Sequence, residues 1–377
     1  MKYRRLGRTN VEVSALGFGA MRLPVVAESG AVDEPAAVEM IRCAIDHGVN
    51  YVDTAYPYHD GASEVVVGKA LRDGYRRKVH LATKLPTWDV KKVEDCDRLL
   101  DEQLRRLQSD RVEFYLLHCL NKQRWPEMRD LGVLDWAARA KADGRIGEVG
   151  FSFHDTFDAF REVVDGYDWP LCQIQYNLVN EDVQAGTEGL EYAAAKGLAV
   201  VIMEPLFGGT LANPPAEIRA IWDAAGRDPV DAALQWLWNQ PKVSLVLSGM
   251  TTLEHVRRNV ASAARSGVAA LARDDLDLIA RVQAKYGELS PIPCTKCGYC
   301  MPCPNGVDIP GNFELYNNAV VFRGSSETLS RNLYRMMPAG ERAAACEQCG
   351  ACEDKCPQGI AIAEELRRVE KEFGESG

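Results

Sequence analysis

The feature that most constrains this chain is its cysteine content near the C-terminus. Eight of the twelve cysteines fall in two runs, CTKCGYCMPCP and CEQCGACEDKCP, each followed directly by a proline. Thiolates that recur every third residue on a tight loop can hold one metal core, and the proline turns the chain away from it. We therefore predict iron–sulfur ligation. The predicted ligands are Cys294, Cys297, Cys300, Cys303, Cys346, Cys349, Cys352 and Cys356.

The second run has, residue for residue, the spacing of bacterial two-cluster ferredoxins. In such runs the fourth cysteine ligates the other cluster. The spacing thus predicts two [4Fe-4S] clusters. One would be held by Cys294, Cys297, Cys300 and Cys356, and the other by Cys346, Cys349, Cys352 and Cys303. The first run departs from the pattern, because only two residues separate Cys300 from Cys303.

Zinc and disulfides are the alternatives to clusters. A repeated C-x-x-C pair also fits a four-cysteine zinc site, although each run here already offers four thiolates and the ferredoxin-type proline. Disulfides need an oxidising compartment, and the segment from Met1 to Asn10 leads into no apolar signal segment. We expect a cytoplasmic protein.

Length and charge exclude several classes of partner. The chain has 377 residues, a formal net charge of −10 and a pI of about 5.3. Nucleic-acid binding needs a concentrated basic face, so we expect no nucleic-acid partner. No run of 18 apolar residues occurs, so we expect no membrane span. The length exceeds one average domain and favours a large domain with a smaller one.

Before the cysteine runs, short β-type segments alternate with amphipathic helical stretches such as Asp89–Leu107. Eight such βα units fit a parallel (β/α)₈ TIM barrel better than an open doubly wound sheet. Two short segments around GRTN, Tyr3–Leu6 and Val11–Ser14, predict a hairpin that closes the barrel bottom. The eight predicted strands are Ala15–Met21, Val49–Ala55, Val79–Lys84, Val112–His118, Gly147–Ser152, Leu171–Asn177, Leu198–Met203 and Val243–Gly249.

A barrel of this kind carries its chemistry at the C-terminal ends of its strands. The second, third and fourth predicted strands end near Asp53, Tyr58, Lys84 and His118. A phenol is a poor acid at neutral pH unless a neighbouring ammonium favours its anion, and Lys84, held by Asp53, could supply that charge. His118 would orient a substrate oxygen. The alternative is an ordinary ion pair beside a packed histidine.

These residues lie in a series of motifs that resembles the aldo-keto reductase superfamily. The motifs are GFGAMRLP, DTAYPYHDGASE, LLHCLN, GFSFHD, QIQYN, MEPLFGG and VLSGMTTLEHVRRN, within about residues 1–285. The resemblance implies a barrel that binds NADH or NADPH without a Rossmann fold and delivers hydride to a carbonyl. It also implies a catalytic tetrad of Asp53, Tyr58, Lys84 and His118, with Tyr58 as general acid. The cysteine-rich tail resembles the branch with a C-terminal ferredoxin-like domain.

The resemblance also implies which residues contact the cofactor, but several of these positions differ from the residues that are common in the family. Phe153 stands where the family commonly has an asparagine, and Met203 where an aromatic ring usually stacks on the nicotinamide. Gly249 and His255 occupy positions where NADPH-specific members carry basic residues, so NADH and NADPH both stay open; Arg257 or Arg258 could compensate. The predicted cofactor-binding residues are Ser152, Gln173, Met203, Gly208, Ser248, Gly249 and Asn259.

The tail is predicted to be a separate domain. GELSPIP, with two prolines, is typical of a linker, and the helical patterns in FELYNNAVV, SRNLYRMM and Ala363–Phe373 favour an α-helical two-cluster domain. We therefore predict an aldo-keto reductase barrel over residues 1–286 and a ferredoxin-like domain over residues 287–377.

The role of the clusters stays open at this point. Hydride carries two electrons and each cluster takes one, so a direct relay needs an intermediary. One interpretation is a carbonyl reductase or alcohol dehydrogenase, acting on a small-molecule carbonyl or alcohol, with structural or sensing clusters. A second is an electron-transfer protein that exchanges electrons with a ferredoxin or partner subunit. A third is a binding scaffold that has lost nicotinamide chemistry.

Overall fold

The computed structural model describes residues 1–294, 296–322 and 325–374. By contacts these residues divide into two compact units. The first comprises Met1–Pro205 and Asp231–Ala272, and the second comprises Leu206–Val230 and Arg273–Gly377. Each unit is described by itself below. None of the described helices is long and apolar enough to cross a membrane.

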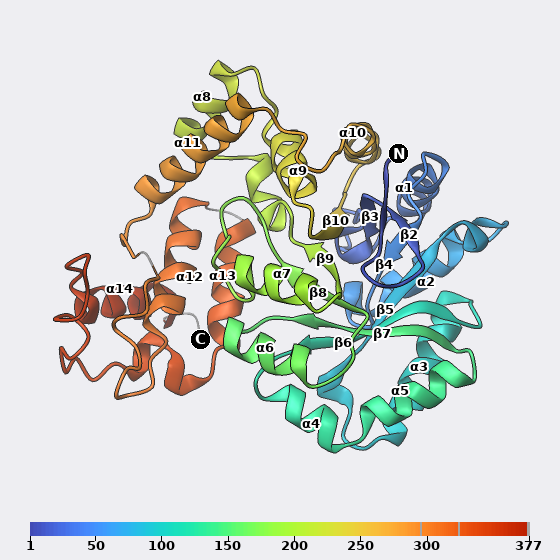
Figure 1. The fold of residues 1–377 in the computed structure, drawn as a ribbon, viewed down its shortest axis with the longest axis horizontal. Coiled ribbons are helices and arrows are strands. Elements are labelled where there is room, and N and C mark those ends of the chain that lie inside the picture. The colour runs from blue at the N-terminus through green and yellow to red at the C-terminus, as the bar shows by residue number, and fades with distance from the viewer. Residues whose placement is uncertain (295, 323–324, 375–377) are drawn as a thin grey trace. The chain divides into compact units, whose positions relative to one another are not determined.

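The first unit is built on a closed barrel of eight parallel strands, in the order β10-β3-β4-β5-β6-β7-β8-β9 (Figure 1). This confirms the predicted (β/α)₈ fold. Each of the eight predicted segments overlaps one barrel strand, although three of the strands extend beyond the predicted limits. The strands are β3 (Leu16–Gly19), β4 (Tyr51–Asp53), β5 (His80–Leu85), β6 (Val112–Leu120), β7 (Ile146–Phe153), β8 (Leu171–Gln175), β9 (Ala199–Met203) and β10 (Val243–Gly249).

The predicted N-terminal hairpin is also present. Strands β1 (Tyr3–Arg5) and β2 (Glu12–Ser14) pair antiparallel, with Tyr3 opposite Ser14. Leu6 and Val13 are fully buried in one apolar cluster with inward-facing barrel residues such as Ala199, the first residue of β9. The hairpin therefore closes the end of the barrel where the strands begin.

Helices lie on the outer side of the barrel strands (Figure 1). The helix predicted over Asp89–Leu107 begins later, at Glu94, because the Asp95 carboxylate accepts hydrogen bonds from the main-chain N–H groups of Lys91 and Lys92. The helices whose residues fall wholly or mostly in the first unit are α1 (Glu34–Asp46), α2 (Ala62–Ala70), α3 (Glu94–Leu107), α4 (Arg124–Asp130), α5 (Val133–Ala142), α6 (Phe157–Asp165), α7 (Gly186–Ala195), α9 (Pro229–Asn239) and α10 (Leu253–Ala264).

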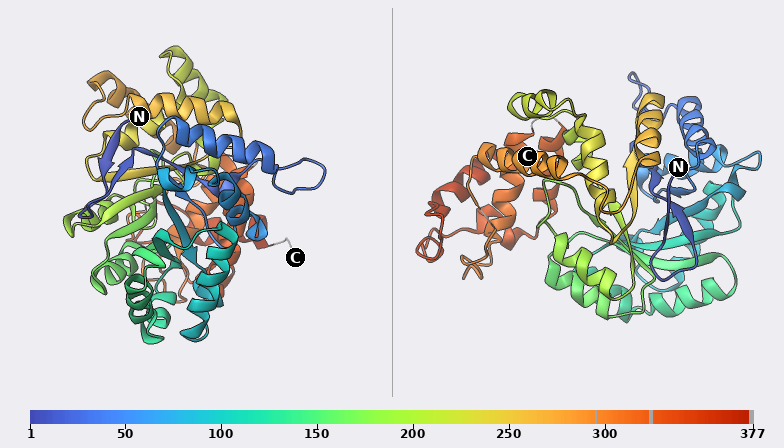
Figure 2. Two further views of the ribbon diagram at one scale, coloured as in Figure 1. Left: turned by 90° about the vertical axis from the view of Figure 1, so that its right-hand side faces the viewer. Right: turned by 45° about the horizontal axis from the view of Figure 1, so that its top comes forward.

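The second unit is helical, as the patterns in the tail predict. Its core includes Phe313, Tyr316, Leu366 and Phe373, and α12 contacts both α13 and α14 (Figure 2). Its helices are α8 (Ala216–Ala224), α11 (Arg273–Leu289), α12 (Ile309–Val321), α13 (Ser325–Met336) and α14 (Ile362–Gly374). The predicted domain boundary between residues 286 and 287 falls inside α11, so GEL of the predicted linker is helical; the domain limits stay a prediction.

A buried carboxylate on α2 ties this helix to β5 and α3. Glu64 Oε1 accepts hydrogen bonds from the Thr83 hydroxyl at 2.6 Å and from Gln103 Nε2 at 2.7 Å, and Oε2 lies 3.2 Å from Arg106 Nη1. Gln103 Nε2 also lies 3.0 Å from the main-chain oxygen of Lys84. Burial raises the pKa of Glu64, while Thr83, Gln103 and Arg106 oppose the rise. These hydrogen bonds fix the backbone of β5 at Thr83 and Lys84.

Removing this carboxylate should destabilise the barrel. We expect Glu64→Ala to lower the free energy of unfolding by about 3–5 kcal/mol, because Arg106 loses a buried partner and Thr83 and Gln103 lose an acceptor. Urea unfolding followed by circular dichroism measures this. Glu102→Ala is the matched control, because Glu102 pairs with the same arginine but is 30% exposed; it should cost about 1 kcal/mol or less. Equal losses in the two variants would contradict the role of Glu64.

Candidate active site

The C-terminal ends of the barrel strands bring most of the predicted site residues to one rim. Asp53 ends β4, Lys84 is the next to last residue of β5, and His118 lies near the end of β6. Ser152 of β7 pairs in register with Gln173 of β8. Met203 ends β9, and Ser248 and Gly249 end β10. Because the strands are parallel and closed into a barrel, these ends encircle one opening.

A buried ion pair lies at this rim. Lys84 Nζ is 2.6 Å from Asp53 Oδ1 and donates a second hydrogen bond to the main-chain oxygen of Thr54 at 2.7 Å. The Lys84 side chain is fully buried. Burial is the largest single influence on the pKa of Lys84 and acts to lower it, but Asp53 and Tyr58 together outweigh it, so the pKa is raised. The ammonium therefore stays charged at neutral pH.

Tyr58 stands beside this pair on a tight turn after β4. The next three residues, His59, Asp60 and Gly61, all have left-handed backbone conformations, with φ values of 52°, 54° and 87°. Lys84 Nζ lies 5.0 Å from the centre of the Tyr58 ring. Burial raises the pKa of Tyr58 to about 12, although the Lys84 charge acts to lower it. The predicted effect of Lys84 is present, but burial outweighs it, so the phenol is protonated at neutral pH.

His118 faces Tyr58 from β6. The two rings are 6.0 Å apart and nearly perpendicular. Burial lowers the pKa of His118 well below its ordinary value, and the charges of Lys84, His154 and Arg124 act in the same direction. The imidazole is therefore neutral. Its Nδ1 is buried without a hydrogen-bond partner among the described residues, so it is free to bind a group outside the chain.

Ser152 and Gln173 form a polar pair that could hold an amide. Gln173 Nε2 lies 3.5 Å from the Met203 sulfur, whereas Gln173 Oε1 is buried and unpartnered within the described structure. The Ser152 hydroxyl oxygen accepts a hydrogen bond from the Cys119 main-chain N–H at 2.9 Å. An unpaired buried carbonyl oxygen requires a donor. The carboxamide NH₂ of a nicotinamide is such a donor, so the residues present fit this cofactor.

The other predicted cofactor-binding residues have different surroundings. Asn259 of α10 donates to the Ser248 hydroxyl at 3.1 Å, so these two predicted residues are brought together. At Gly249 a Cβ would lie 3.3 Å from side-chain carbons of Arg22, so the arginine packs over the glycine. Gly208 is left-handed, with φ of 66°, and belongs to the second unit; its role stays a prediction.

The departure at Phe153 has a structural explanation. The ring is fully buried and lies 5.1 Å from Phe160 and 6.4 Å from Phe151, both in edge-on contacts. Phe153 thus packs in the apolar layer between β7 and α6. It offers no polar atom for a carboxamide.

Sequence reasoning missed three side chains around this rim. His154 follows β7, and its Nδ1 is 3.2 Å from Gln184 Oε1. Trp88 lies 5.2 Å from the His118 ring, and Arg124 lies over Trp88. The histidine in GFSFHD, directly after a strand, was a usable signal. Trp88 and Arg124 lie in segments after the strands, where spacing alone gives no position.

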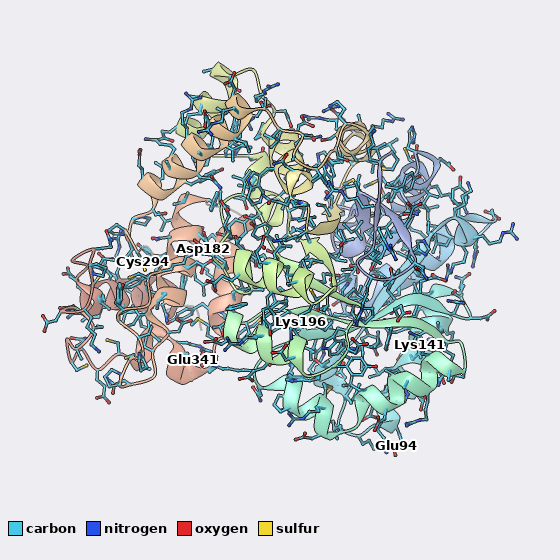
Figure 3. The ribbon with its side chains drawn as sticks, in the orientation of Figure 1. Glu94, Lys141, Asp182, Lys196, Cys294 and Glu341 are labelled. Atoms are coloured by element: carbon cyan, nitrogen blue, oxygen red, sulfur yellow. The ribbon has the colours of Figure 1, made fainter. Side chains whose placement is uncertain are left out.

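Four cysteines from both runs line one pocket of the second unit. They are Cys294, Cys297, Cys300 and Cys356, the four that the ferredoxin spacing groups together (Figure 3 labels Cys294). In the other set, burial raises the pKa of Cys352, and Glu353, Cys346 and Cys303 add to the rise, so Cys303 lies near the second run. Thr295 is outside the described residues. The first set fits one multi-iron core; the grouping of the second set stays a prediction.

A single metal ion needs its ligands around one point, whereas an iron–sulfur cluster needs thiolates around a larger core. Among residues 1–294, 296–322 and 325–374, no three His, Cys, Asp or Glu side chains are arranged to hold a single metal ion. The first cysteine set lines a pocket together with apolar side chains such as those of Ile309 and Phe313. All twelve cysteines are free of disulfides.

Comparison with known proteins finds two family matches in the chain. Residues 15–270 match the aldo/keto reductase family, and residues 293–361 match the 4Fe-4S dicluster domain. Aldo-keto reductase YhdN of Bacillus subtilis (strain 168) is 30% identical over 233 residues, which cover 58% of this chain and 66% of YhdN. NADH-specific methylglyoxal reductase of Escherichia coli (strain K12) is 27% identical over 310 residues, covering 70% of this chain and 93% of that protein.

A solved structure of an aldo-keto reductase also resembles this chain. The crystal structure of an aldo-keto reductase from Klebsiella pneumoniae in complex with NADPH has a TM-score of 0.61 and 26% identity, covering 75% of this chain and 95% of that chain. The family match spans more than half of the present sequence. The chain therefore belongs to the aldo/keto reductase family of oxidoreductases, and it carries a C-terminal 4Fe-4S dicluster domain.

Proposed function

We propose that this oxidoreductase reduces an aldehyde or ketone with a nicotinamide cofactor. The observation that carries the proposal is the charged Lys84 beside a protonated Tyr58 and a neutral His118, all at one barrel rim. A reduced nicotinamide supplies the hydride when bound. The residues of the chain must then hold the carbonyl oxygen and give it a proton.

Tyr58 is the proposed general acid. Burial raises the pKa of its hydroxyl to about 12, so the group is protonated at neutral pH and can donate the proton to the carbonyl oxygen. The phenolate that remains is stabilised by the Lys84 ammonium, which Asp53 holds in place. The neutral His118 ring donates a hydrogen bond to the same carbonyl oxygen and orients it.

The cofactor would be held by the side chains already paired at the rim. Ser152 and Gln173 would bind the carboxamide, and Met203 would pack against the ring face. Asn259 and Ser248 would bind the adenosine portion. We propose the substrate to be a small carbonyl compound or, in the reverse direction, an alcohol.

The second unit is proposed to hold two [4Fe-4S] clusters with the cysteine sets described above. Reduced cysteines are needed for this, which favours the cytoplasm as its location. Electron transfer to a partner protein is the second candidate function. It is favoured by the exposure of Cys297 and Cys349, which would bring each cluster close to the surface.

Replacing the general acid should abolish most turnover. We expect Tyr58→Phe to lower kcat by about 10²- to 10⁴-fold while nicotinamide binding is nearly unchanged, because only the proton donor is lost. Lys84→Met should also lower kcat, and it should move the alkaline limb of the pH–kcat profile to higher pH, because the charge that lowers the pKa of the phenol is gone. Tyr56→Phe, two residues away, should keep the parent rate. Parent turnover by Tyr58→Phe would mean that another group is the acid.

Cofactor preference tests the adenosine end of the site. Gly249 and His255 offer no fixed positive charge at their own positions, so we expect NADH and NADPH to bind within about tenfold of each other, a difference below about 1.4 kcal/mol. Titration of the parent with each nucleotide measures this. A thousandfold preference for NADPH would reject the expectation. Arg22→Met and Arg257→Met would then show which arginine supplies the charge.

Iron content and double variants test the cluster assignment. Protein purified without oxygen should be brown and hold about eight iron atoms per chain. Cys297→Ala should lose about half of this iron, and adding Cys356→Ala should cause no further loss, because both belong to one set. Adding Cys303→Ala to Cys297→Ala should remove the rest. Cys43→Ala, on α1, is the control. Stoichiometric zinc without colour, or equal losses in both double variants, would contradict the assignment.

A further inference from the structure

An arginine near the tetrad has no acidic partner. Arg124, the first residue of α4, is partly buried. Its Nη1 lies 3.3 Å from the main-chain oxygen of Cys119, and its guanidinium carbon lies 5.5 Å from the centre of the Trp88 ring. It makes no ion pair with any carboxylate in the described residues. Most of its five N–H donors are therefore available to a group outside the chain.

The arginine is connected to the catalytic rim through Trp88. The His118 ring contacts two aromatic side chains, with ring centres of Tyr58 at 6.0 Å and Trp88 at 5.2 Å. The Arg124 charge contributes to the low pKa of His118 and acts to lower the pKa of Cys119, although burial raises the latter to about 11. The positive charge of Arg124 therefore influences His118, the residue that would orient the substrate carbonyl.

The charged groups that act on the pKa of His118 are all basic. Lys84 is neutralised by Asp53 at 2.6 Å. The other groups that act electrostatically on His118 are Arg124 and His154, and the pKa of His154 is itself lowered by burial, which keeps it neutral. Arg124 is left with a net charge, in a chain whose overall charge is −10. An anionic ligand would neutralise this charge.

We infer that the substrates of this enzyme are aldehydes or ketones that also carry a carboxylate, which Arg124 binds while Trp88 packs against the carbon chain. The inference rests on the proposed function and specifies its substrate class. A guanidinium presents a planar fork of donors that matches a carboxylate, and such charge-assisted hydrogen bonds are stronger than neutral ones. The Trp88 face offers an apolar surface between the arginine and His118.

A structural role for Arg124 predicts a different outcome. Cys119 has a left-handed φ of 55°, at an irregularity in the pairing of β6 with β7, and the bond from Arg124 to its carbonyl oxygen supports that conformation. If this were the whole role, replacing the arginine would reduce activity on every carbonyl substrate alike. Only a substrate-binding role makes the loss depend on a carboxylate.

The test compares 4-oxobutanoate with butanal, which differ only in having a carboxylate or a methyl group at the far end. We expect the parent to have a higher kcat/KM for 4-oxobutanoate. Arg124→Met should lower that value by about 10- to 100-fold and change the value for butanal by less than about twofold. Arg124→Lys should lie between, because an ammonium is not a planar fork. Arg129→Met, on the same helix and paired with Asp130, is the control and should change neither value.

Three results would overturn the inference: equal loss on both substrates in Arg124→Met, no preference of the parent for 4-oxobutanoate, or the same effect in Arg129→Met. Calorimetric binding of 4-hydroxybutanoate against butan-1-ol makes the same comparison without turnover. If the parent reduced neither aldehyde, the proposed function would fail for these substrates. Weaker binding of 4-hydroxybutanoate to Arg124→Met would still support the carboxylate site, and unchanged binding would reject it.

Discussion

The rest of the active site depends on the ion pair between Lys84 and Asp53. An ammonium fully removed from water loses much of its hydration, and without a close counter-ion it would lose its proton. Asp53 at 2.6 Å and the Thr54 carbonyl at 2.7 Å offset this cost. The pair exists because β4 and β5 are neighbours in register, with Asp53 opposite Ala82, two residues before Lys84. A charge held in this way would stabilise the phenolate of Tyr58, the proposed general acid, after it has lost its proton.

Burial has opposite consequences for the two groups that would contact a carbonyl oxygen. It raises the pKa of Tyr58 and lowers that of His118, so both are neutral hydrogen-bond donors at neutral pH. A phenol is already protonated at neutral pH with its ordinary pKa, so burial extends this state of Tyr58 to higher pH, whereas burial decides the state of His118, whose ordinary pKa lies near neutrality. The same low dielectric strengthens the influence of Lys84 on each. The arrangement is therefore suited to stabilise negative charge on a carbonyl oxygen.

Much of this arrangement could be predicted from the sequence. Short apolar strands alternating with amphipathic helices predict a parallel barrel, and the barrel fixes Asp53, Lys84 and His118 at one end. Cysteine spacing alone groups the four cysteines that line the pocket of the second unit. The direction of the Tyr58 pKa shift could not be predicted, because it depends on burial depth. Arg124 and Glu64 were missed because their partners lie in other elements, and spacing along the chain does not record contacts between elements.

In the proposed reaction, hydride passes directly from the nicotinamide to the substrate carbon, without the clusters as carriers. The decisive experiment is single-turnover reduction of an accepted carbonyl substrate by a nicotinamide deuterated at the transferring C4 position, in ordinary water and without oxygen. We expect one deuterium on the alcohol carbon of the product and no reduced-cluster signal by electron paramagnetic resonance. Solvent hydrogen on that carbon, together with reduced clusters, would contradict it and would assign the chemistry to electron transfer.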